Sequence, residues 1–472
     1  MSEKEDQFKT RRLDPFRLQV GEAVIYVDQR LGQDISTQAL SQVYEAGRLP
    51  GSKVVVMPDI HVGYGLPIGG VLASRELISA EAVGVDINCG VSLSTLDVKG
   101  EELESQLRPL LKAIMKQVPA GVGKGNPFLR DRYDYRQGLL GVLLKGAAFI
   151  IEELGLGDRD ELSAIEDQGQ LKVDEGVAKN LLSHLSAREI KKHWLQLGTL
   201  GSGNHFIEFQ LPETIYAAEK AEAFGIQASR PLLMLHTGSR GLGNNTAQHY
   251  IKSFKKSASK YQMKKYKLTA LPADSEEARE YMSAMNAMAN YAFANRQLIR
   301  YLLRQVLEKR LGSGLKIKTV YDLAHNIVKL EKHQGKDYYL HRKGATRAFP
   351  PGHPELTRPD FRALGQPALI PGSMGTPSYL VTGTQKALEE TFGTVSHGSG
   401  RVMSRRQARR ELNKKEFKRF RRENYVFSGS GDNLLDEAPE AYKASADIIH
   451  ILEGAGLIEP VVSLRPLGTI KG

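Results

Sequence analysis

Cysteine is almost missing from this chain, because Cys89 is the only one among 472 residues. A single cysteine excludes an intramolecular disulfide and is typical of a protein from a reducing compartment. No apolar run approaches the roughly 20 residues that a membrane span needs. The first six residues, Met-Ser-Glu-Lys-Glu-Asp, are too polar for a signal peptide. We therefore expect a cytoplasmic protein that has no membrane partner.

The chain also lacks Pro/Ser-rich and low-complexity segments that would divide it into domains. Short β-branched runs alternate with helix-like stretches along the sequence. The polar side chains that we consider as ligands below extend from Asp86 to His397, so one site would draw on most of the chain. This favours one large domain over residues 1–472, with a helical insertion around 250–311. Within that insertion, Asp274 or Ser275 is predicted to cap a long helix that extends to about Leu311. An apolar stripe on this helix predicts core packing rather than a functional site; its residues are Tyr281, Met285, Met288, Ala292 and Ile299.

Acidic residues are outnumbered: 65 Lys and Arg face 54 Asp and Glu, which gives a net charge of +11 and a pI near 9.3. Such a balance points to a polyanionic partner, with nucleic acid first, although it is also compatible with a surface that only favours solubility. Two segments concentrate the charge. Residues 250–267 hold seven lysines, and Arg405–Arg422 hold ten Lys or Arg against two Glu. We predict an exposed helix at Arg405–Arg422, which is either a solvated face or a contact for a nucleic-acid backbone.

The only cysteine lies in the sequence Val-Asp-Ile-Asn-Cys-Gly, three residues after Asp86. A thiolate and a carboxylate this close suit a borderline metal such as Zn²⁺, Mn²⁺ or Fe²⁺. The alternative is a small buried cysteine beside a turn aspartate. Four of the 12 histidines favour the metal, because each adjoins Gly, Asn, Thr or Ser and several of them lie just past an apolar run; they are His205, His236, His325 and His397. By ligand softness alone, one cysteine and three histidines would suggest Zn²⁺.

Glycine- and serine-rich loops next to these histidines are suited to binding phosphate through backbone N–H groups. His397 lies in Ser-His-Gly-Ser-Gly-Arg, where small neighbours leave a nucleophile accessible; the alternative is a turn histidine without chemistry. Arg401 could neutralise charge on a phosphorus centre. Asp59 and His61 follow a strand-like run and either orient the metal ligands or belong to a structural turn.

Taken together, these motifs resemble the RtcB family of RNA-splicing ligases. They span most of the chain in order, and each alone is weak, whereas the set is highly specific. The matching segments are 57–61, 84–90, 201–208, 236–243, 325–326, 341–347, 371–379, 396–401 and 471–472. The family often has Ala where this chain has Ser399, a change between small residues.

The resemblance implies a GTP- and Mn²⁺-dependent ligase for tRNA splicing or RNA repair. It would join an RNA 3′-phosphate or 2′,3′-cyclic phosphate end to a 5′-hydroxyl end, and an archease would be a possible activator. With the alternation noted above, it implies an α+β fold: central mixed β-sheets surrounded by helices, with the active-site cleft at strand ends.

The resemblance also implies roles for individual residues. Cys89 would bridge two Mn²⁺ ions, with Asp86 and His205 on one ion and His236 and His325 on the other. His397 would attack the α-phosphate of GTP and form a histidine–GMP intermediate. The other catalytic residues would be Asp59, Arg240 and Arg401. The contacts to GTP would be Asn204, Glu208, Ser373, Ser378, Gly398, Gly400, Tyr442 and Lys471.

Two other classes use the same residues differently. A two-metal phosphoesterase or nuclease would need no GTP and no histidine nucleophile, so it would stay active without His397. A non-catalytic RNA-binding protein would hold a structural metal, which is closed and four-coordinate. Five candidate ligands and several phosphate-type loops favour an open site, and therefore the ligase.

Overall fold

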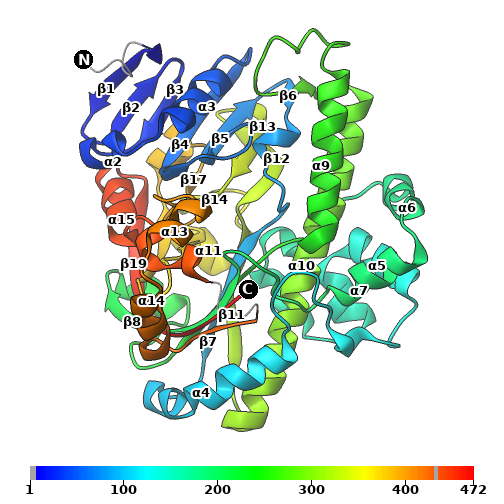
Figure 1. Ribbon diagram of the computed structural model, residues 1–472, viewed down its shortest axis with the longest axis vertical. Coiled ribbons are helices and arrows are strands. Elements are labelled where there is room, and N and C mark those ends of the chain that lie inside the picture. Colours follow the sequence, from blue (N-terminus) through cyan, green and yellow to red (C-terminus); the bar gives the residue numbers. More distant parts are fainter. Residues whose placement is uncertain (1–6, 430–433) are drawn as a thin grey trace.

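Two β-sheets and a long buried helix form the framework of the protein (Figure 1). The structure is a computed structural model that describes residues 7–429 and 434–472, so the N-terminal hexapeptide lies outside the described residues. One sheet has seven strands, and its order is β1 (Thr10–Asp14), β2 (Arg17–Val20), β3 (Ala23–Tyr26), β4 (Ser52–His61), β5 (Ile68–Ser74), β13 (Lys336–Lys343) and β12 (Asn326–His333).

The second sheet has eight strands, and its order is β11 (Ile317–Ala324), β7 (Gly90–Leu96), β9 (Leu232–Thr237), β8 (Phe206–Ile215), β19 (Ile458–Lys471), β16 (Ser378–Gly383) and β15 (Pro367–Ile370), with β18 (Val426–Ser428) beside β19. Two short pairs complete the strands: β6 (Leu77–Ile78) with β10 (Leu271–Pro272), and β14 (Ala345–Arg347) with β17 (Thr394–Ser396). Most neighbours are antiparallel, but β3–β4 and β18–β19 are parallel. The predicted α+β fold with mixed sheets is therefore confirmed.

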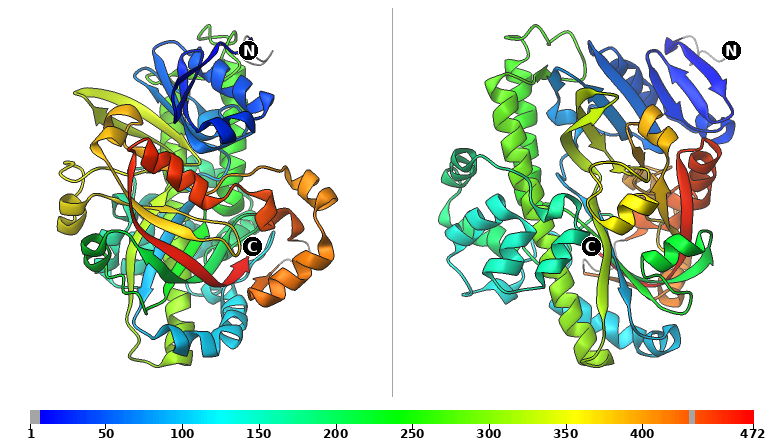
Figure 2. Two further views of the ribbon diagram at one scale, coloured as in Figure 1. Left: turned by 90° about the vertical axis from the view of Figure 1, so that its left-hand side faces the viewer. Right: turned by 180° about the vertical axis from the view of Figure 1, so that it is seen from behind.

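Helices cover the outer faces of these sheets (Figures 1 and 2). They are α2 (Gln29–Gln33), α3 (Thr37–Gly47), α4 (Gly100–Gln117), α5 (Tyr135–Lys145), α6 (Glu175–Ser183), α7 (Ala187–Leu195), α8 (Ala218–Ala223), α9 (Arg240–Ser257), α10 (Glu276–Leu311), α11 (Pro359–Leu364), α12 (Gln385–Glu390), α13 (Arg405–Glu411), α14 (Lys414–Glu423) and α15 (Ser445–Gly454). Within the described residues, no helix combines the length and apolarity required to cross a membrane.

The 36-residue helix α10 forms much of the core. It begins where the sequence predicts, because the Ser275 side chain accepts a hydrogen bond from the N–H of Ala278. The apolar stripe predicted on it is buried, and alanines between the large residues let α4, α5 and α9 pack closely.

That residues 1–472 form one domain, with an insertion around 250–311, stays a prediction.

The basic segment Arg405–Arg422 is not one helix, so that prediction is wrong in detail. Leu412 adopts an extended conformation and ends α13. Asn413 then caps α14, because its side chain accepts hydrogen bonds from the N–H groups of Lys415 and Glu416. A side chain that competes for backbone N–H groups breaks a helix that composition alone predicts to be continuous. Both helices project from the body of the molecule (Figure 2, left).

A buried ion cluster joins α10 to the eight-stranded sheet. The Arg296 Nε donates to Asp322 Oδ1 at 2.7 Å, and the Arg300 guanidinium contacts the other carboxylate oxygen. Arg296 and Asp322 are fully buried. Arg296 also donates to the carbonyls of Asn88 and Thr237, at 2.8 and 3.2 Å. One guanidinium therefore holds the turn before β7 and the end of β9 in fixed positions.

Replacing Asp322 with Ala leaves two buried guanidinium groups without their carboxylate. We expect the free energy of unfolding to fall by about 3–5 kcal/mol, the usual cost of breaking a buried ion pair. Urea denaturation followed by circular dichroism measures this change. Asp337→Ala, at an exposed position in the β12–β13 hairpin, is the matched control and should stay within about 0.5 kcal/mol. A loss below about 1 kcal/mol for Asp322→Ala would contradict the assignment.

Candidate active site

Strand pairing in the eight-stranded sheet brings four of the predicted metal ligands to one edge. Gly90 of β7 pairs with Thr237 of β9, and Val91 pairs with His236. On the other side of β9, Phe206 of β8 also pairs with His236. Ala324 of β11 pairs with Gly90. Cys89, His205, His236 and His325 therefore lie at neighbouring strand ends, although 236 residues separate the first from the last.

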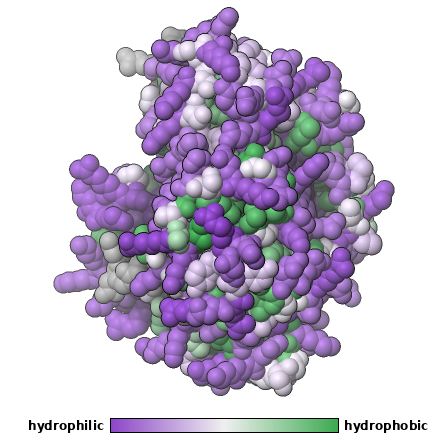
Figure 3. Space-filling view, turned by 90° about the vertical axis from the view of Figure 1, so that its right-hand side faces the viewer, coloured by the Kyte–Doolittle hydropathy of each residue, from purple (hydrophilic) through white to green (hydrophobic). Residues whose placement is uncertain are grey.

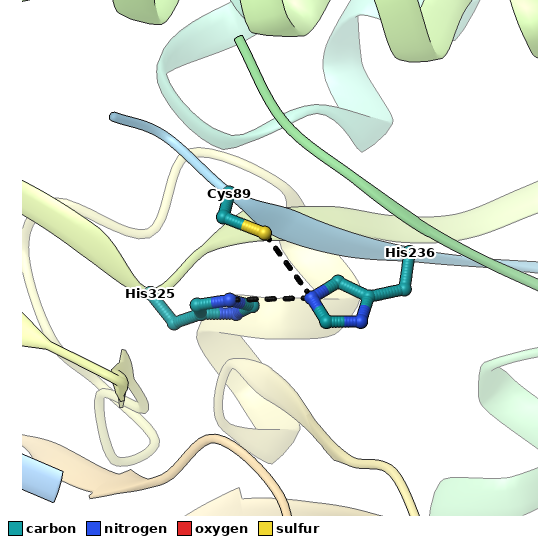
Figure 4. A group of neighbouring side chains, drawn as sticks. All are labelled: Cys89, His236 and His325. Carbon is teal, nitrogen blue, oxygen red and sulfur yellow. Dashed lines mark hydrogen bonds between the residues drawn. The ribbon is translucent and has the colours of Figure 1, made fainter. Parts of the chain in front are cut away.

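The ligand atoms of these residues converge. Figure 4 shows those of Cys89, His236 and His325. Cys89 Sγ lies 3.3 Å from His236 Nε2 and 3.4 Å from His205 Nε2. His236 Nε2 lies 3.3 Å from His325 Nε2, and His205 Nε2 lies 2.9 Å from Asp86 Oδ2. Two groups can each hold one ion, namely Cys89–His236–His325 and Asp86–Cys89–His205, with the ligand atoms of each within 4.8 Å of one another. Cys89 is common to both groups.

Backbone carbonyls decide which histidine nitrogens face this centre. His205 Nδ1 is 3.1 Å from the Leu200 carbonyl, and His236 Nδ1 is 2.9 Å from the Asn204 carbonyl. Because a carbonyl only accepts, each Nδ1 carries the proton and each Nε2 presents a lone pair. Lone pairs, a carboxylate and a thiol then face one another, an arrangement that a cation stabilises. The residues present therefore fit a divalent metal pair.

Burial has opposite effects on the two kinds of ligand. It raises the pKa of the Cys89 thiol well above the ordinary value, and the nearby Asp86 carboxylate raises it further. Burial lowers the pKa of His236 and of His325 well below the ordinary value. The imidazoles are thus neutral, as metal ligands must be, whereas the thiol needs a bound cation to become a thiolate.

The turn that carries Asp86 is fixed by residues that the sequence analysis did not single out. Ser239 donates to Asp86 Oδ1 from its N–H at 3.0 Å and from its hydroxyl at 3.3 Å. A Cβ on Gly238 would lie 2.4 Å from the same oxygen, so only glycine fits there. Asn88 has a positive φ of 53° and donates its N–H to the Asn326 carbonyl. Nothing in the sequence near Ser239 signals its contact with Asp86.

His397 lies on the other side of the centre, after β17, and its ring centroid is 4.8 Å from that of His325. Its Nδ1 is 2.6 Å from Asp59 Oδ2, which also accepts from the His397 backbone N–H at 3.3 Å. The sequence leaves Asp59 either as a group that orients the metal ligands or as part of a structural turn; in the structure its carboxylate contacts His397. Gly344 leaves room for the imidazole, because a Cβ there would lie 2.9 Å from its Cε1. This geometry directs Nδ1 toward the carboxylate and Nε2 away from it.

Lys443 supports Asp59 and was not predicted. Its buried Nζ donates to the carbonyls of Pro58 and Ile60, at 2.7 and 2.9 Å, on either side of the aspartate. Its backbone N–H donates to the Gly400 carbonyl at 3.0 Å, within the loop that follows His397. Burial lowers its pKa to about 8. One residue, through its side chain and its backbone, thus ties the Asp59 strand to the His397 loop, and only three-dimensional structure reveals it. His61 Nδ1 bonds the Asp59 carbonyl at 2.9 Å.

A pocket of about 700 Å³ opens over the ligands and His397. In Figure 3 the outline of the molecule is indented on the left, which is the side that faces the viewer in Figure 1. The N-terminal turn of α3 and the start of α13 line opposite parts of the pocket. The predicted site residues that line it are Cys89, Asn204, His205, His236, His325, His397, Gly398, Gly400, Arg401 and Tyr442.

The remaining predicted residues lie behind this lining. They are Asp59, Asp86, Glu208, Arg240, Ser373, Ser378 and Lys471. Several are joined by hydrogen bonds to the wall or to one another. Lys471 Nζ donates to Asn204 Oδ1 at 2.5 Å, and Gln210 Nε2 donates to both Glu208 and Ser378, at 2.6 and 2.9 Å.

Three cationic side chains surround this part of the site. The Arg240 guanidinium is buried against Gly201, where a Cβ would lie within 2.0 Å of it. Arg401 donates to the Tyr442 hydroxyl at 2.9 Å and lies over the same ring. Burial lowers the pKa of Lys471 and raises that of Glu208, which accepts from Thr469 at 2.6 Å. The site therefore combines candidate metal ligands, an oriented imidazole and cations suited to phosphate.

Comparison with known proteins shows what this chain is similar to. Residues 42–472 match the family described as tRNA-splicing ligase RtcB. A tRNA-splicing ligase RtcB from Archaeoglobus fulgidus is 41% identical over 95% of this chain and 94% of its own length. The protein of that name from Thermococcus kodakarensis is 39% identical over the same shares. The RNA-splicing ligase RtcB homolog 1 of Entamoeba dispar is 38% identical over 93% of this chain and 83% of its own length. From this agreement along almost the whole sequence, the chain belongs to the tRNA-splicing ligase RtcB family.

Proposed function

We propose that this protein is an RNA ligase that uses GTP and two Mn²⁺ ions to join RNA ends in tRNA splicing or RNA repair. The ends are a 3′-phosphate or 2′,3′-cyclic phosphate on one RNA and a 5′-hydroxyl on the other. Relatives named as splicing ligases support the RNA substrate. The single observation that carries the mechanism is His397, held by Asp59 with Nε2 free, beside the converging metal ligands.

The first step is transfer of GMP to His397. The proton stays on Nδ1, and this N–H group donates a hydrogen bond to Asp59. The Nε2 lone pair therefore points away from the carboxylate and attacks the α-phosphorus of GTP. A P–N bond forms, the bond from the α-phosphorus to the bridging oxygen breaks, and pyrophosphate leaves. Asp59 stabilises the positive charge that develops on the imidazole, as buried carboxylates do beside catalytic histidines.

The second and third steps transfer GMP onward and seal the RNA. An oxygen of the RNA 3′-phosphate attacks the phosphorus of the histidine–GMP, and the P–N bond breaks. The 5′-hydroxyl then attacks the 3′-phosphate, a 3′,5′-phosphodiester forms, and GMP leaves. Positioning and charge stabilisation dominate such transfers. A cyclic phosphate must first be opened by water to a 3′-phosphate.

Five residues would hold the two ions: Asp86, Cys89, His205, His236 and His325. When bound, the ions supply positive charge that stabilises the phosphoryl oxygens. Ligand softness alone would suggest Zn²⁺, whereas the resemblance to the family favours Mn²⁺. Arg240 and Arg401 would add fixed positive charge at the same phosphates.

The guanosine and phosphate contacts remain as predicted from the resemblance. The residues are Asn204, Glu208, Ser373, Ser378, Gly398, Gly400, Tyr442 and Lys471. The hydrogen bond from Lys471 to Asn204, which lines the pocket, supports this set. An archease would act as an activator by speeding entry into the first step. The single cysteine and the RNA substrate favour a cytoplasmic location.

Incubation with α-labelled GTP and Mn²⁺ tests the first step. We expect a covalent label that resists alkali and is lost in acid, as a phosphoramidate is, and that is absent from His397→Ala. Asp59→Asn should slow labelling by about 10²- to 10⁴-fold, because the imidazole loses its oriented proton acceptor. Asp337→Asn serves as the control and should label normally. If His397→Ala retained activity on phosphoesters while the protein took up no label, the two-metal phosphoesterase would replace the ligase.

Metal content provides a second test that does not depend on activity. After equilibrium dialysis against Mn²⁺, we expect two ions per chain in the original protein. Cys89→Ala removes the ligand that both groups share, so neither ion should remain tightly bound. His236→Ala removes a ligand from one group only, so this variant should lose one ion. Its affinity for that ion should fall by more than the roughly 10- to 100-fold that follows when a residue next to a ligand is changed. His184→Ala, at an exposed position, should bind as before. Two tight ions in Cys89→Ala would refute the shared ligand.

The helices α13 and α14 should contact the RNA backbone. Replacing the exposed Arg406, Arg410, Arg419 and Arg422 with Gln removes up to four phosphate contacts. Each contact to single-stranded RNA contributes about 0.7 to the slope of log K against log salt. We therefore expect the slope to become shallower by up to about 3, with labelling by GTP unchanged. An unchanged slope would exclude these helices from the RNA contact surface.

A further inference from the structure

A second basic surface lies at the end of α9 and in the segment that follows it, and the proposed function does not use it. Between residues 250 and 268 there are seven lysines and no Asp or Glu. All seven are exposed: Lys252, Lys255, Lys256, Lys260, Lys264, Lys265 and Lys267. We call these side chains, together with Tyr64, Tyr261 and Tyr266, the lysine–tyrosine surface.

Only part of this charge is neutralised by neighbours. Lys255 pairs with Glu81 at 3.0 Å, Lys260 with Glu277 at 3.3 Å, and Lys267 with Glu45 at 2.9 Å. The other four lysines form no ion pair with any residue in the described part of the chain: Lys252, Lys256, Lys264 and Lys265. The surface therefore keeps an excess of positive charge that a polyanion can complement.

Tyrosine rings are interleaved with these ammonium groups. Lys255 Nζ is 4.9 Å from the centroid of Tyr64, Lys260 Nζ is 4.9 Å from Tyr261, and Lys265 Nζ is 5.2 Å from Tyr266. Tyr64 is 53% exposed, although it is a large aromatic residue. Exposed rings beside cations are the combination that binds single-stranded RNA, because bases stack on the rings while the cations contact phosphates.

The backbone that carries Tyr64 is held firmly. Gln42 bonds both the carbonyl and the N–H of Gly63, at 2.6 and 3.2 Å. The buried Lys343 ammonium donates to the Tyr64 carbonyl and, at 2.9 Å, to the Glu81 carbonyl. Gly65 has a φ of 74°, and a Cβ there would lie 2.7 Å from Glu81. An exposed ring on a fixed backbone loses little conformational freedom when it binds a ligand.

The lysine–tyrosine surface is connected to the site through the loop that carries Tyr64. His61 and Val62 line the pocket, and Tyr64 follows two residues later. On the α13 side, Ser404, Arg405 and Gln407 line the pocket. The loop that leads to Tyr64 and the start of α13 therefore both adjoin the pocket, and each is connected to a basic surface. A ligase must hold two RNA ends at the same time, so two surfaces are what its substrates require.

We propose that the lysine–tyrosine surface binds the backbone and bases of one of the two RNA strands that the site joins. The lysines contact phosphates, and Tyr64 stacks on a base near the reacting end. The proposal rests on the proposed function for the identity of the RNA, but its charge and geometry are independent of His397.

The test replaces the four unpaired lysines, Lys252, Lys256, Lys264 and Lys265, with Gln. Binding of single-stranded RNA with a 3′-phosphate, and separately with a 5′-hydroxyl, is measured across a salt series. For at least one RNA we expect a slope shallower by up to about 3. The matched control replaces Lys112, Lys116, Lys309 and Lys318, which are exposed on α4 and at the end of α10 and the start of β11, and should leave the slope unchanged.

A second variant separates stacking from charge. Tyr64→Ala should weaken binding of the same RNA by about 5- to 100-fold, the range for one lost base stack, whereas Tyr64→Phe keeps the ring and the affinity. In the absence of RNA, GTP should label all these variants as it labels the original protein. If the original protein took up no label, that result would count against the proposed function and not against this surface. Unchanged slopes and affinities for both RNAs would overturn the proposal. If archease stimulation were lost while RNA binding was unchanged, the surface would belong to a protein partner instead.

Discussion

The structure depends most on the convergence of Cys89 with three imidazoles at the ends of adjacent strands. Each ligand comes from a different part of the chain, and strand register brings them together. The buried Arg296 holds both the turn before β7 and the end of β9, so the same ion cluster that stabilises α10 also fixes the ligand positions. Burial keeps the imidazoles neutral and disfavours the thiolate, so a bound cation would favour ionisation of Cys89, and cation binding would be linked to the protonation of this cysteine.

The second constraint is the orientation of His397. Asp59 accepts a hydrogen bond from Nδ1, Gly344 leaves space for the ring, and Lys443 donates to a carbonyl of the strand on which Asp59 lies. These contacts come from β4, β17 and the loops around them, which belong to a different sheet system from the metal ligands. His397 and the candidate metal ligands can thus approach one another only when both sheets are assembled. This explains why the motifs are spread over residues 57–472.

Much of this could be predicted from the sequence. The long helix after Ser275, the buried strands before Asp59 and His236, and the family are recoverable because capping residues, β-branched runs and short motifs are local signals. The break at Asn413 was missed because it depends on competition between a side chain and the backbone. Ser239 and Lys443 were missed because their partners, Asp86 and the carbonyls around Asp59, lie 153 and 383–385 residues away. Contacts over such separations leave no pattern in one sequence.

A crystal structure of the protein after reaction with GTP and Mn²⁺ tests the central claim most directly. The account predicts continuous electron density from His397 Nε2 to the phosphorus of GMP, with Nδ1 still bonded to Asp59 and two metal ions bound at Cys89. A bond from phosphorus to Nδ1 or to another residue would contradict the geometry proposed for the nucleophile. Intact GTP in the pocket with no covalent bond, in protein that still joins RNA, would contradict the histidine–GMP mechanism itself.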